Sequence, residues 1–582
     1  MWRFLFSLFV FFLMPFLGSV FTLEVKAQEE IQTFSIDSSY DLYARKTIEA
    51  TLVRDDRSLY FYVEKSWWDS RSREEQNTIR IALAELGLEF QRHIYPVLTS
   101  TFGSEPKPGI DKDERITVLI HQMGGEAGGY FRIDDVYERL QSPGSNEREM
   151  VYLNSKYIGG LEIKSFLAHE FTHLITINQK DLLRKVTEEI WLNEARAEYA
   201  PTLLGYDDGY KGSNLERRVR DFLAKPSDSF IDWVNGKGDY AAANVFTQYL
   251  VDQYGVNILA DSLKSSLVGI PSLNEALQKN GFQKDFSEIF TDWAITVLVN
   301  DCNLGEKYCY KNKNLQNLRI TPTFYYIPRA QTIFSTYHTV PYWGASWHRL
   351  VGGEQKLTLE FGGSDSGDFE VPYVLCDVTE SCLVRFFALD EDQKGIISFS
   401  DFATQYSSLT IIPFSKSRGS EPISKENPFS WKVTVERGLG AEEDAEIIPQ
   451  LLARLAELQE QVRQLQMRLA VLRGSSPYPV GQSEQNEFSC GRFDADLSFG
   501  MRNEDVRCLQ EFLVSQGESI YPEGLVTGNF LSLTRQAVLR FQEKYAPEIL
   551  APLGLDKGTG YVGQVTRNKM NSLLEFSTAT SI

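Results

Sequence analysis

Residues 165–179 read SFLAHEFTHLITINQ, and this stretch decides the fold of the surrounding chain. It reads as a helix, on which His169 and His173 share one face with Cβ atoms about 5–6 Å apart. That spacing suits two ligands of one tetrahedral zinc ion. Glu170 follows His169 directly and lies one residue further around the helix. We therefore expect it to take a proton from water at the metal, as in a hydrolase. The alternative is a helix with two surface histidines, but the chain has only 6 histidines and a chance match is rare.

A third ligand is expected on a second helix, because two histidines leave a catalytic zinc one protein ligand short. The segment WLNEARAEYA (191–200) begins a helical pattern in which Glu194 is the candidate. Glu198 lies on the same face and can accept the free N–H of a ligand histidine, which fixes its tautomer. Glu188 and Glu189 are rival ligands, but they lie nearer the start of the helix and lack the Asn-Glu context.

These residues resemble the gluzincins, the thermolysin-like and aminopeptidase-N-like zinc metallopeptidases. The resemblance implies a zinc ion held by His169, His173 and Glu194, with Glu170 as general base. It also implies Glu198 as the partner of a ligand histidine.

The resemblance extends upstream of the motif. ITVLIHQ (116–122) and MVYLN (150–154) read as strands, with AGGYF (127–131) between them. AGGYF is similar to the edge strand that gluzincins hold against an extended substrate; ordinary sheet with a glycine bulge is the alternative. The order AGGYF, SNEREMVYLN, AHEFTHLI resembles secreted bacterial peptidases of the hyicolysin type.

A tyrosine downstream is a further candidate. DYAAANVFTQYLVDQYG (239–255) has apolar residues at helical spacing behind an N-cap aspartate. In aminopeptidase-like gluzincins a tyrosine opens a similar helix and donates a hydrogen bond to the oxyanion, which implies this role for Tyr240. The alternative is a core or capping side chain.

Length and charge limit the possible classes. A chain of 582 residues is too long for one ordinary core and predicts three or more domains. Its 59 basic and 79 acidic residues give a formal charge of −20, which argues against nucleic-acid binding.

Residues 1–27 combine Arg3, a long apolar run and a Val-Lys-Ala site, which predicts a signal peptide and a secreted or envelope-associated protein. An uncleaved N-terminal anchor is the alternative.

The six cysteines form three close pairs in the sequence. In an exported protein this clustering favours three local disulfides, with free buried thiols as the alternative. The expected pairs are Cys302 with Cys309, Cys376 with Cys382, and Cys490 with Cys508.

The fold class that we predict is multidomain. A catalytic α+β domain (28–310) would have a hairpin at 46–68, a helix at 73–98 and a helical lower half at 214–299. An antiparallel β-sandwich (320–438) would follow. Within it, DEDQKGIISFSD (390–401) imitates a calcium loop, but Lys394 occupies a ligand position and no glutamate closes the loop, which favours a hairpin turn.

The last part of the chain predicts a spacer and a terminal domain. Residues 444–473 carry leucine, isoleucine and valine alternately three and four apart, which predicts a short coiled coil that could join copies of the chain, or a lone amphipathic helix. A linker (474–487) follows. Residues 488–576 resemble the three-helix bacterial peptidoglycan-binding-like domain, which implies a cell-wall glycan as ligand, although this fold also serves as a protein-contact module.

We therefore expect an exported zinc endopeptidase that acts on polypeptides and is tethered to the envelope by its terminal domain. Two other classes stay open: an enzyme that cleaves the stem peptides of peptidoglycan, and a wall-binding adhesin or scaffold whose zinc site is silent. The substrate, the cleavage specificity and the oligomeric state do not follow from the sequence.

Overall fold

The computed structural model describes residues 30–328, 333–352, 356–365, 367–400, 402–417 and 426–436, and, with short gaps, 492–579. The chain divides into two compact units, Met1–Glu442 and Glu443–Ile582. The predicted signal peptide, coiled coil and linker, and Cys490 of the third cysteine pair, lie outside the described residues. No helix within the described ranges combines the length and the apolarity needed to cross a bilayer.

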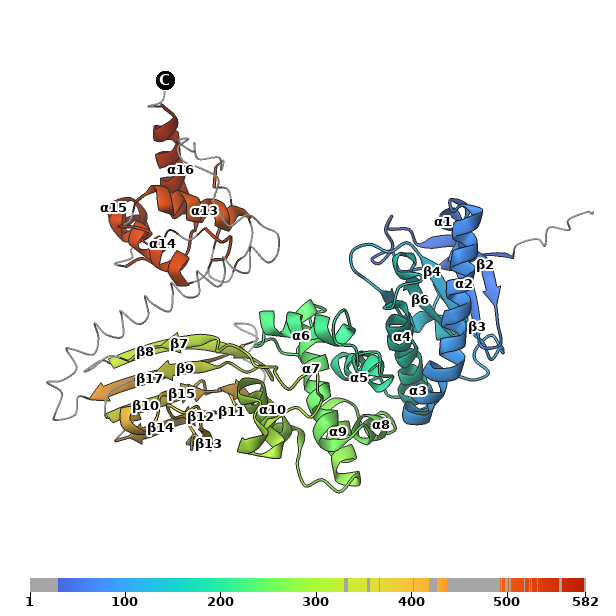
Figure 1. Cartoon of the computed structure of the whole chain (residues 1–582), viewed down its shortest axis with the longest axis horizontal. Helices are drawn as coiled ribbons and strands as arrows, with labels where there is room; N and C mark the ends of the chain where they lie inside the picture. Colours follow the sequence, from blue (N-terminus) through green and yellow to red (C-terminus); the bar gives the residue numbers. More distant parts are fainter. Residues whose placement is uncertain are drawn as a thin grey trace, which may run out of the picture. The chain divides into compact units, whose positions relative to one another are not determined.

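A six-stranded mixed sheet begins the first unit (Figure 1). Its spatial order is β1-β2-β3-β4-β6-β5, with β3, β4 and β6 parallel and β5 antiparallel to β6. The strands are β1 (Ile31–Ser35), β2 (Thr47–Asp55), β3 (Leu59–Glu64), β4 (Ile116–His121), β5 (Gly129–Tyr130) and β6 (Met150–Asn154). The predicted hairpin and the two predicted strands are present, and the AGGYF segment supplies the strand at the sheet edge.

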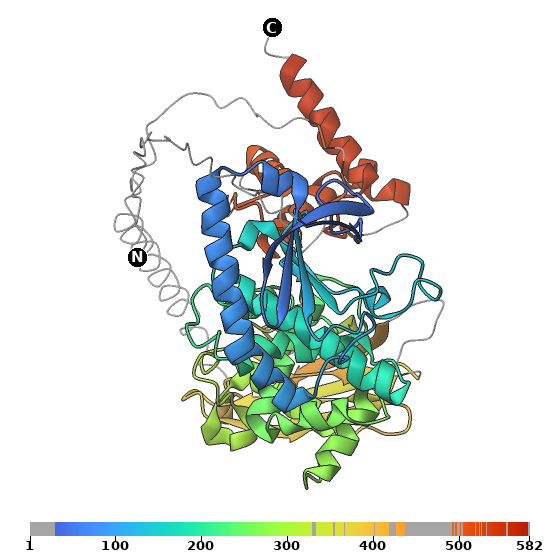
Figure 2. The ribbon, with the colours of Figure 1, turned by 90° about the vertical axis from the view of Figure 1, so that its right-hand side faces the viewer.

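The central strands β4 and β6 are buried along their whole length, because both faces of the sheet are covered. Val118 and Val151 pack on helices, whereas their neighbours Leu119 and Tyr152 enter a smaller apolar cluster on the opposite face. Helices α2 (Arg73–Glu89) and α4 (Ile163–Ile177) contact the sheet, and α3 (Tyr95–Phe102) packs against α4. Figure 2 shows α2 running alongside the strands.

The helix predicted at 73–98 is longer than expected. A capping box between Ser72 and Glu75 starts α2, and a π-helical turn at Phe90–Ile94 carries it into α3, which ends at Gly103. The lower half is helical, as predicted. Its helices are α5 (Ile190–Leu203), α6 (Asn214–Ala224), α7 (Lys237–Tyr254), α8 (Asn257–Leu263), α9 (Gly269–Lys279) and α10 (Phe286–Val299).

Two sheets with an apolar core between them form the β-sandwich. One has the order β14-β10-β17-β8 and the other β13-β12-β15-β9-β7. The strands are β7 (Phe324–Tyr326), β8 (Ile333–Pro341), β9 (His348–Val351), β10 (Lys356–Gly363), β12 (Pro372–Cys376), β13 (Cys382–Phe386), β14 (Lys394–Phe399), β15 (Ser408–Ile411) and β17 (Glu426–Glu436). The prediction of purely antiparallel pairing is wrong at β7, which is parallel to β9. The chain crosses to the other sheet through β8 between these two strands, and such a crossover permits a parallel pair.

The segment that imitates a calcium loop is a turn between the two sheets. The backbone N–H groups of Asp392 and Lys394 both donate to Asp390 Oδ1, at 3.0 and 2.9 Å. The predicted hairpin is therefore wrong, because β13 before the turn and β14 after it belong to different sheets. Two predicted disulfides are confirmed, Cys302–Cys309 and Cys376–Cys382.

The sandwich and the helical half share one apolar core. The Trp343 ring lies 4.9 Å from the ring of Phe286 and 5.2 Å from that of Phe290, both on α10. The indole N–H of Trp347 donates to the carbonyl oxygen of Ala294 at 2.9 Å. Packing is therefore continuous from α10 into the sandwich.

The second unit has its own apolar core and contains the helices α13 (Glu504–Ser515), α14 (Ser532–Lys544), α15 (Ala546–Ile549) and α16 (Gln564–Ala579). Two buried glutamines make equivalent hydrogen bonds. Gln510 Oε1 accepts from the backbone N–H groups of Thr527 and Gly528, and Gln542 Oε1 accepts from those of Thr559 and Gly560. The unit thus contains the same local structure twice: a glutamine on a helix accepts hydrogen bonds from the backbone of the loop that follows.

Candidate metal centre and its cleft

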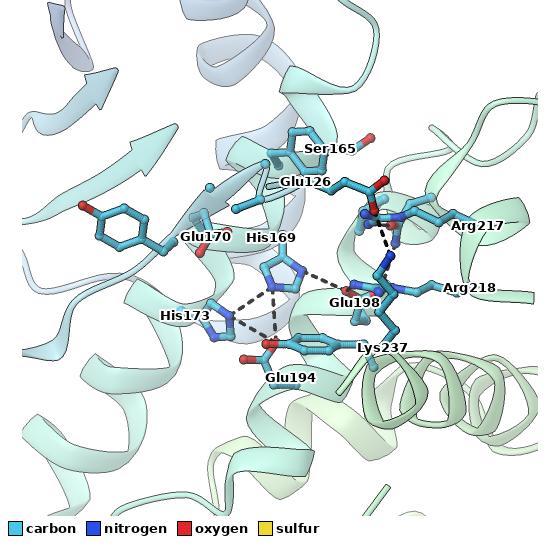
Figure 3. Close-up of a pocket in the computed structure, with 18 of the residues that line it drawn as sticks. Glu126, Ser165, His169, Glu170, His173, Glu194, Glu198, Arg217, Arg218 and Lys237 are labelled. Carbon is cyan, nitrogen blue, oxygen red and sulfur yellow. Dashed lines mark hydrogen bonds and ion pairs between the residues drawn. The ribbon is translucent and has the colours of Figure 1, made fainter. Parts of the chain in front are cut away.

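The three predicted metal ligands lie on two adjacent helices. α4 carries His169 and His173 one turn apart, and α5 packs beside it and carries Glu194 (Figure 3). His173 is buried, and His169 and Glu194 are partly exposed to a cleft of about 480 Å³. The sequence had placed these residues on helix faces, and the packing of α4 against α5 brings the faces together.

The three donor atoms form a nearly regular triangle. His169 Nε2 lies 3.1 Å from His173 Nε2, and Glu194 Oε2 lies 3.3 Å from the first and 3.6 Å from the second. Three corners of a tetrahedron around zinc, with bonds of 2.0–2.1 Å, are about 3.3 Å apart. The side chains therefore fit a zinc ion with a fourth position open toward the cleft.

The electrostatics of this cluster also fit the binding of a cation. Glu194 Oε2 is buried, and apart from the ion-pair contacts with the two imidazoles it has no hydrogen-bond partner among the described residues. Burial by itself would lower the pKa of His173, but Glu194 outweighs it and raises that pKa to about 9. Burial would raise the pKa of Glu194, but the two imidazoles hold it well below its usual range. A divalent cation would take over the stabilisation that a proton supplies here.

Side chains behind the ligands hold the imidazoles in place. Asn193 Oδ1 lies 3.0 Å from His173 Nδ1, and Glu198 Oε1 lies 3.6 Å from His169 Nδ1. Arg218 on α6 in turn forms a buried ion pair with Glu198 through two of its nitrogens. Burial would raise the pKa of Glu198, but Arg218 outweighs it and lowers that pKa to about 2, so the carboxylate stays charged.

The rival ligands are engaged elsewhere. Glu188 Oε2 accepts a hydrogen bond from buried Arg196 at 2.8 Å and lies 3.4 Å from Lys180 Nζ. Glu189 Oε2 accepts from the indole N–H of Trp191 at 2.6 Å. Glu194 is thus the carboxylate of the α5 segment whose oxygen meets both ligand histidines.

Glu170 lies between the metal ligands and the edge strand. With the two histidines it forms a group whose ligand atoms lie within 4.8 Å of one another and could hold a metal ion. Glu194 makes the shorter contacts to both rings, so we assign the third corner to Glu194 and leave Glu170 beside it. Burial raises the pKa of Glu170, and the imidazoles lower it.

The glycines of AGGYF allow this close approach of β5. A Cβ atom on Gly129 would lie 2.6 Å from the carbonyl oxygen of Tyr152 and 3.0 Å from Cγ of Glu170. A Cβ atom on Gly128 would lie 2.4 Å from the ring of Phe166. The strand edge therefore borders the cleft immediately beside Glu170, and a side chain at either position would push it away.

Two tyrosines line the cleft from opposite sides. Tyr240 on α7 donates to Asn235 Oδ1 at 2.8 Å, and its ring lies 4.8 Å from the guanidinium carbon of Arg218. Tyr40, in the segment after β1, stacks on Tyr130 with ring centroids 4.6 Å apart. Burial first, and then nearby carboxylates including Glu194, raise the pKa of both phenols, so both stay protonated and can donate.

Sequence reasoning missed Tyr40, Arg218 and the contact of Asn193. Asn193 is part of the WLNE element, but the sequence alone assigns no role to this asparagine. Glu198 is buried in the structure and needs a counter-charge, but nothing in its sequence context identifies Arg218 as the partner. Tyr40 gave no signal, because it lies far upstream and outside any motif.

Replacing Glu198 by glutamine should weaken metal affinity by about 10–100-fold, because the partner of a ligand histidine loses its charge. Competition with a chelator of known affinity would measure this. Glu188→Gln is the matched control: it also breaks a buried ion pair and should lower the melting temperature, yet leave metal affinity unchanged. Equal losses of affinity in both variants would assign Glu198 a purely structural role.

Comparison with known proteins finds similarity to a metalloprotease over part of the chain. No family model matches the chain. Neutral metalloprotease ShpI of Staphylococcus hyicus is 28% identical over 241 residues, which cover 36% of this chain and 52% of that protein. The chain thus spans about half the length of this curated relative.

Two solved structures share little with the chain. A family GH115 4-O-methyl-α-glucuronidase, BtGH115A, is 7% identical, with a TM-score of 0.12 over 57% of this chain and 53% of its own. The IMPa metallopeptidase from Pseudomonas aeruginosa is 9% identical, with a TM-score of 0.11 over 70% of this chain and 50% of its own. Both scores are too low to indicate a common fold.

Proposed function

We propose that this chain is an exported zinc-dependent endopeptidase of the gluzincin type, in which Glu170 is the general base. The observation that carries the proposal is the triangle of His169 Nε2, His173 Nε2 and Glu194 Oε2 in one cleft with β5, the strand at the edge of the sheet. The identity to a neutral metalloprotease supports the same activity. Zinc bound at this triangle would supply a Lewis acid that polarises a carbonyl and acidifies water.

The residues of the chain then bind the peptide, move the proton and stabilise the oxyanion. An extended peptide pairs with the edge of β5, which brings its scissile carbonyl over the ligand triangle. Glu170, next to that edge, takes a proton from the attacking water on a carboxylate oxygen and returns it to the leaving amine. The protonated phenol of Tyr240 turns its one O–H away from Asn235 Oδ1 and donates it to the oxygen on which negative charge develops.

The direct test is a casein-cleavage assay of the exported chain with and without a chelator, with zinc measured on the same sample. We expect one zinc per chain and cleavage that chelation abolishes. Labelled peptidoglycan fragments in a parallel assay separate a general peptidase from an enzyme for stem peptides. A chain that holds zinc and cleaves neither substrate would favour the adhesin or scaffold.

Tyr240→Phe should lower kcat by about 10²-fold and change KM less, because the hydrogen bond matters mainly in the transition state. Steady-state kinetics on a soluble peptide would measure both constants. Tyr40→Phe removes the same hydroxyl from the other side of the cleft and is the control. If Tyr40→Phe lowers kcat and Tyr240→Phe does not, the oxyanion donor is Tyr40.

We also propose that residues 488–576 tether the enzyme to the cell envelope. The support is the order of sequence motifs and a terminal unit with a separate apolar core. A chain that ends at Glu436 should keep its specific activity on a soluble peptide but no longer sediment with purified cell-wall sacculi. Equal sedimentation of the short and full chains would contradict the tether.

A further inference from the structure

The cleft beside the ligand triangle is lined by four cationic side chains, three from α6 and one from the start of α7. Three of them have a carboxylate partner. The pairs are Arg218 with Glu198, Arg220 with Asp221 at 3.5 Å, and Lys237 with Glu126 at 2.9 Å. The fourth cation is Arg217.

Arg217 has no carboxylate oxygen within ion-pair distance among the described residues. Within the described part of the chain it donates one short hydrogen bond, from Nη2 to the side-chain oxygen of Asn214 at 2.6 Å. The side chain is partly buried in the wall of the cleft, and Figure 3 shows it reaching inward from α6. Burial, and then the neighbouring Arg218, lower the pKa of Arg217.

The carboxylates near Arg217 offset its charge through space but make no direct ion pair with it among the described residues. Glu126, Glu198 and Asp221 all lie within electrostatic range of its guanidinium. Each of the three is already paired with one of the other cations. A guanidinium that is partly stripped of water and has no carboxylate in direct contact is less stable than one paired with a carboxylate.

We propose that Arg217 binds the carboxylate of a glutamate or aspartate side chain of the substrate, close to the scissile bond. Arginine presents a planar fork of donors that matches a carboxylate with two parallel hydrogen bonds. Arg217, β5 and the ligand triangle line the same cleft, so a peptide paired with β5 would pass beside Arg217. The inference rests on the proposed peptidase function and adds to it a preference for acidic peptides.

The test uses quenched fluorescent peptides that differ only by glutamate or glutamine at each position around one cleavage site. For the full chain, kcat/KM should favour glutamate at one position by about tenfold or more, the usual effect of a charge-assisted hydrogen bond. Arg217→Gln should bring this ratio close to one, and Arg217→Glu should favour lysine at that position. Arg220→Gln removes the same charge from the same helix at an ion-paired, exposed site, and should keep the preference for glutamate.

Several outcomes would overturn the inference. One is equal cleavage of glutamate and glutamine peptides, and another is an equal loss of preference in Arg217→Gln and Arg220→Gln, which would indicate diffuse electrostatics. A preference that disappears when only the peptide C-terminus is amidated would show that the bound carboxylate is terminal.

A separate binding experiment distinguishes a failure of this inference from a failure of the proposed function. Fluorescence polarisation of the glutamate and glutamine peptides on the full-length Glu170→Gln chain measures affinity without turnover. If the parent chain cleaves nothing, the peptidase proposal fails. Tighter binding of the glutamate peptide, lost in Glu170→Gln/Arg217→Gln, would still support the subsite, and equal binding would overturn it.

Discussion

Replacing Glu170 by glutamine should lower kcat by about 10²-fold or more while the zinc content stays unchanged. The amide keeps the shape of the side chain beside Gly129 and His169 but cannot take a proton from water. Kinetics on a soluble peptide, with zinc measured on the same preparation, would show both effects.

Two comparisons sharpen this result. Glu170→Asp keeps the base but moves it back from the cleft, and should retain more activity than Glu170→Gln. Full activity in Glu170→Gln would remove Glu170 from the mechanism. Loss of zinc in Glu170→Gln would instead make Glu170 a metal ligand, a role that its distance from the histidines leaves open to test.

Replacing Glu194 by alanine should abolish zinc binding and, with it, activity. Two imidazoles alone leave the site one protein ligand short, and the lost oxygen is the one that meets both Nε2 atoms. Metal analysis after dialysis should show about one zinc per parent chain and almost none in the variant.

Glu189→Ala is the control for Glu194→Ala. It removes a carboxylate from the same segment, but one that accepts a hydrogen bond from Trp191 and does not touch the histidines. It should keep its zinc. If Glu198→Ala loses more zinc than Glu194→Ala, the roles of ligand and supporting carboxylate are reversed.

The meeting of His169, His173 and Glu194 could be predicted because its geometry is mostly local. His169 and His173 share a helix face by spacing alone, and Glu194 with Glu198 share another. The step from two faces to one site needed only that the helices pack together. Strands β4 and β6 could also be predicted from the sequence, because both are short apolar runs.

The surroundings of the site depend on contacts between residues far apart in the sequence. Tyr40 enters the cleft because the segment after β1 returns beside β5 and its ring stacks on Tyr130. Arg217 and Arg218 are adjacent in the sequence, yet one is paired with Glu198 and the other is not. A pattern of charges does not reveal such differences, because they depend on where α6 packs.

The parallel pair of β7 and β9 escaped prediction for the same reason. Alternating apolar residues identify a strand and its buried face but not its neighbour in the sheet. The turn at Asp390 was misassigned because a hairpin and a link between sheets use the same local turn residues.

The apolar core that joins α10 to the sandwich limits how this chain can be divided or recombined. Ending the polypeptide after α10 would leave Phe286 and Phe290 facing water where Trp343 now covers them, so the shortest fragment that folds should extend to the last strand, β17. A chimera that takes the sandwich from a related chain would also have to take α10 from it, because α10 and the sandwich each supply one side of the same interface. The sandwich therefore folds together with the helical half, within the first of the two compact units.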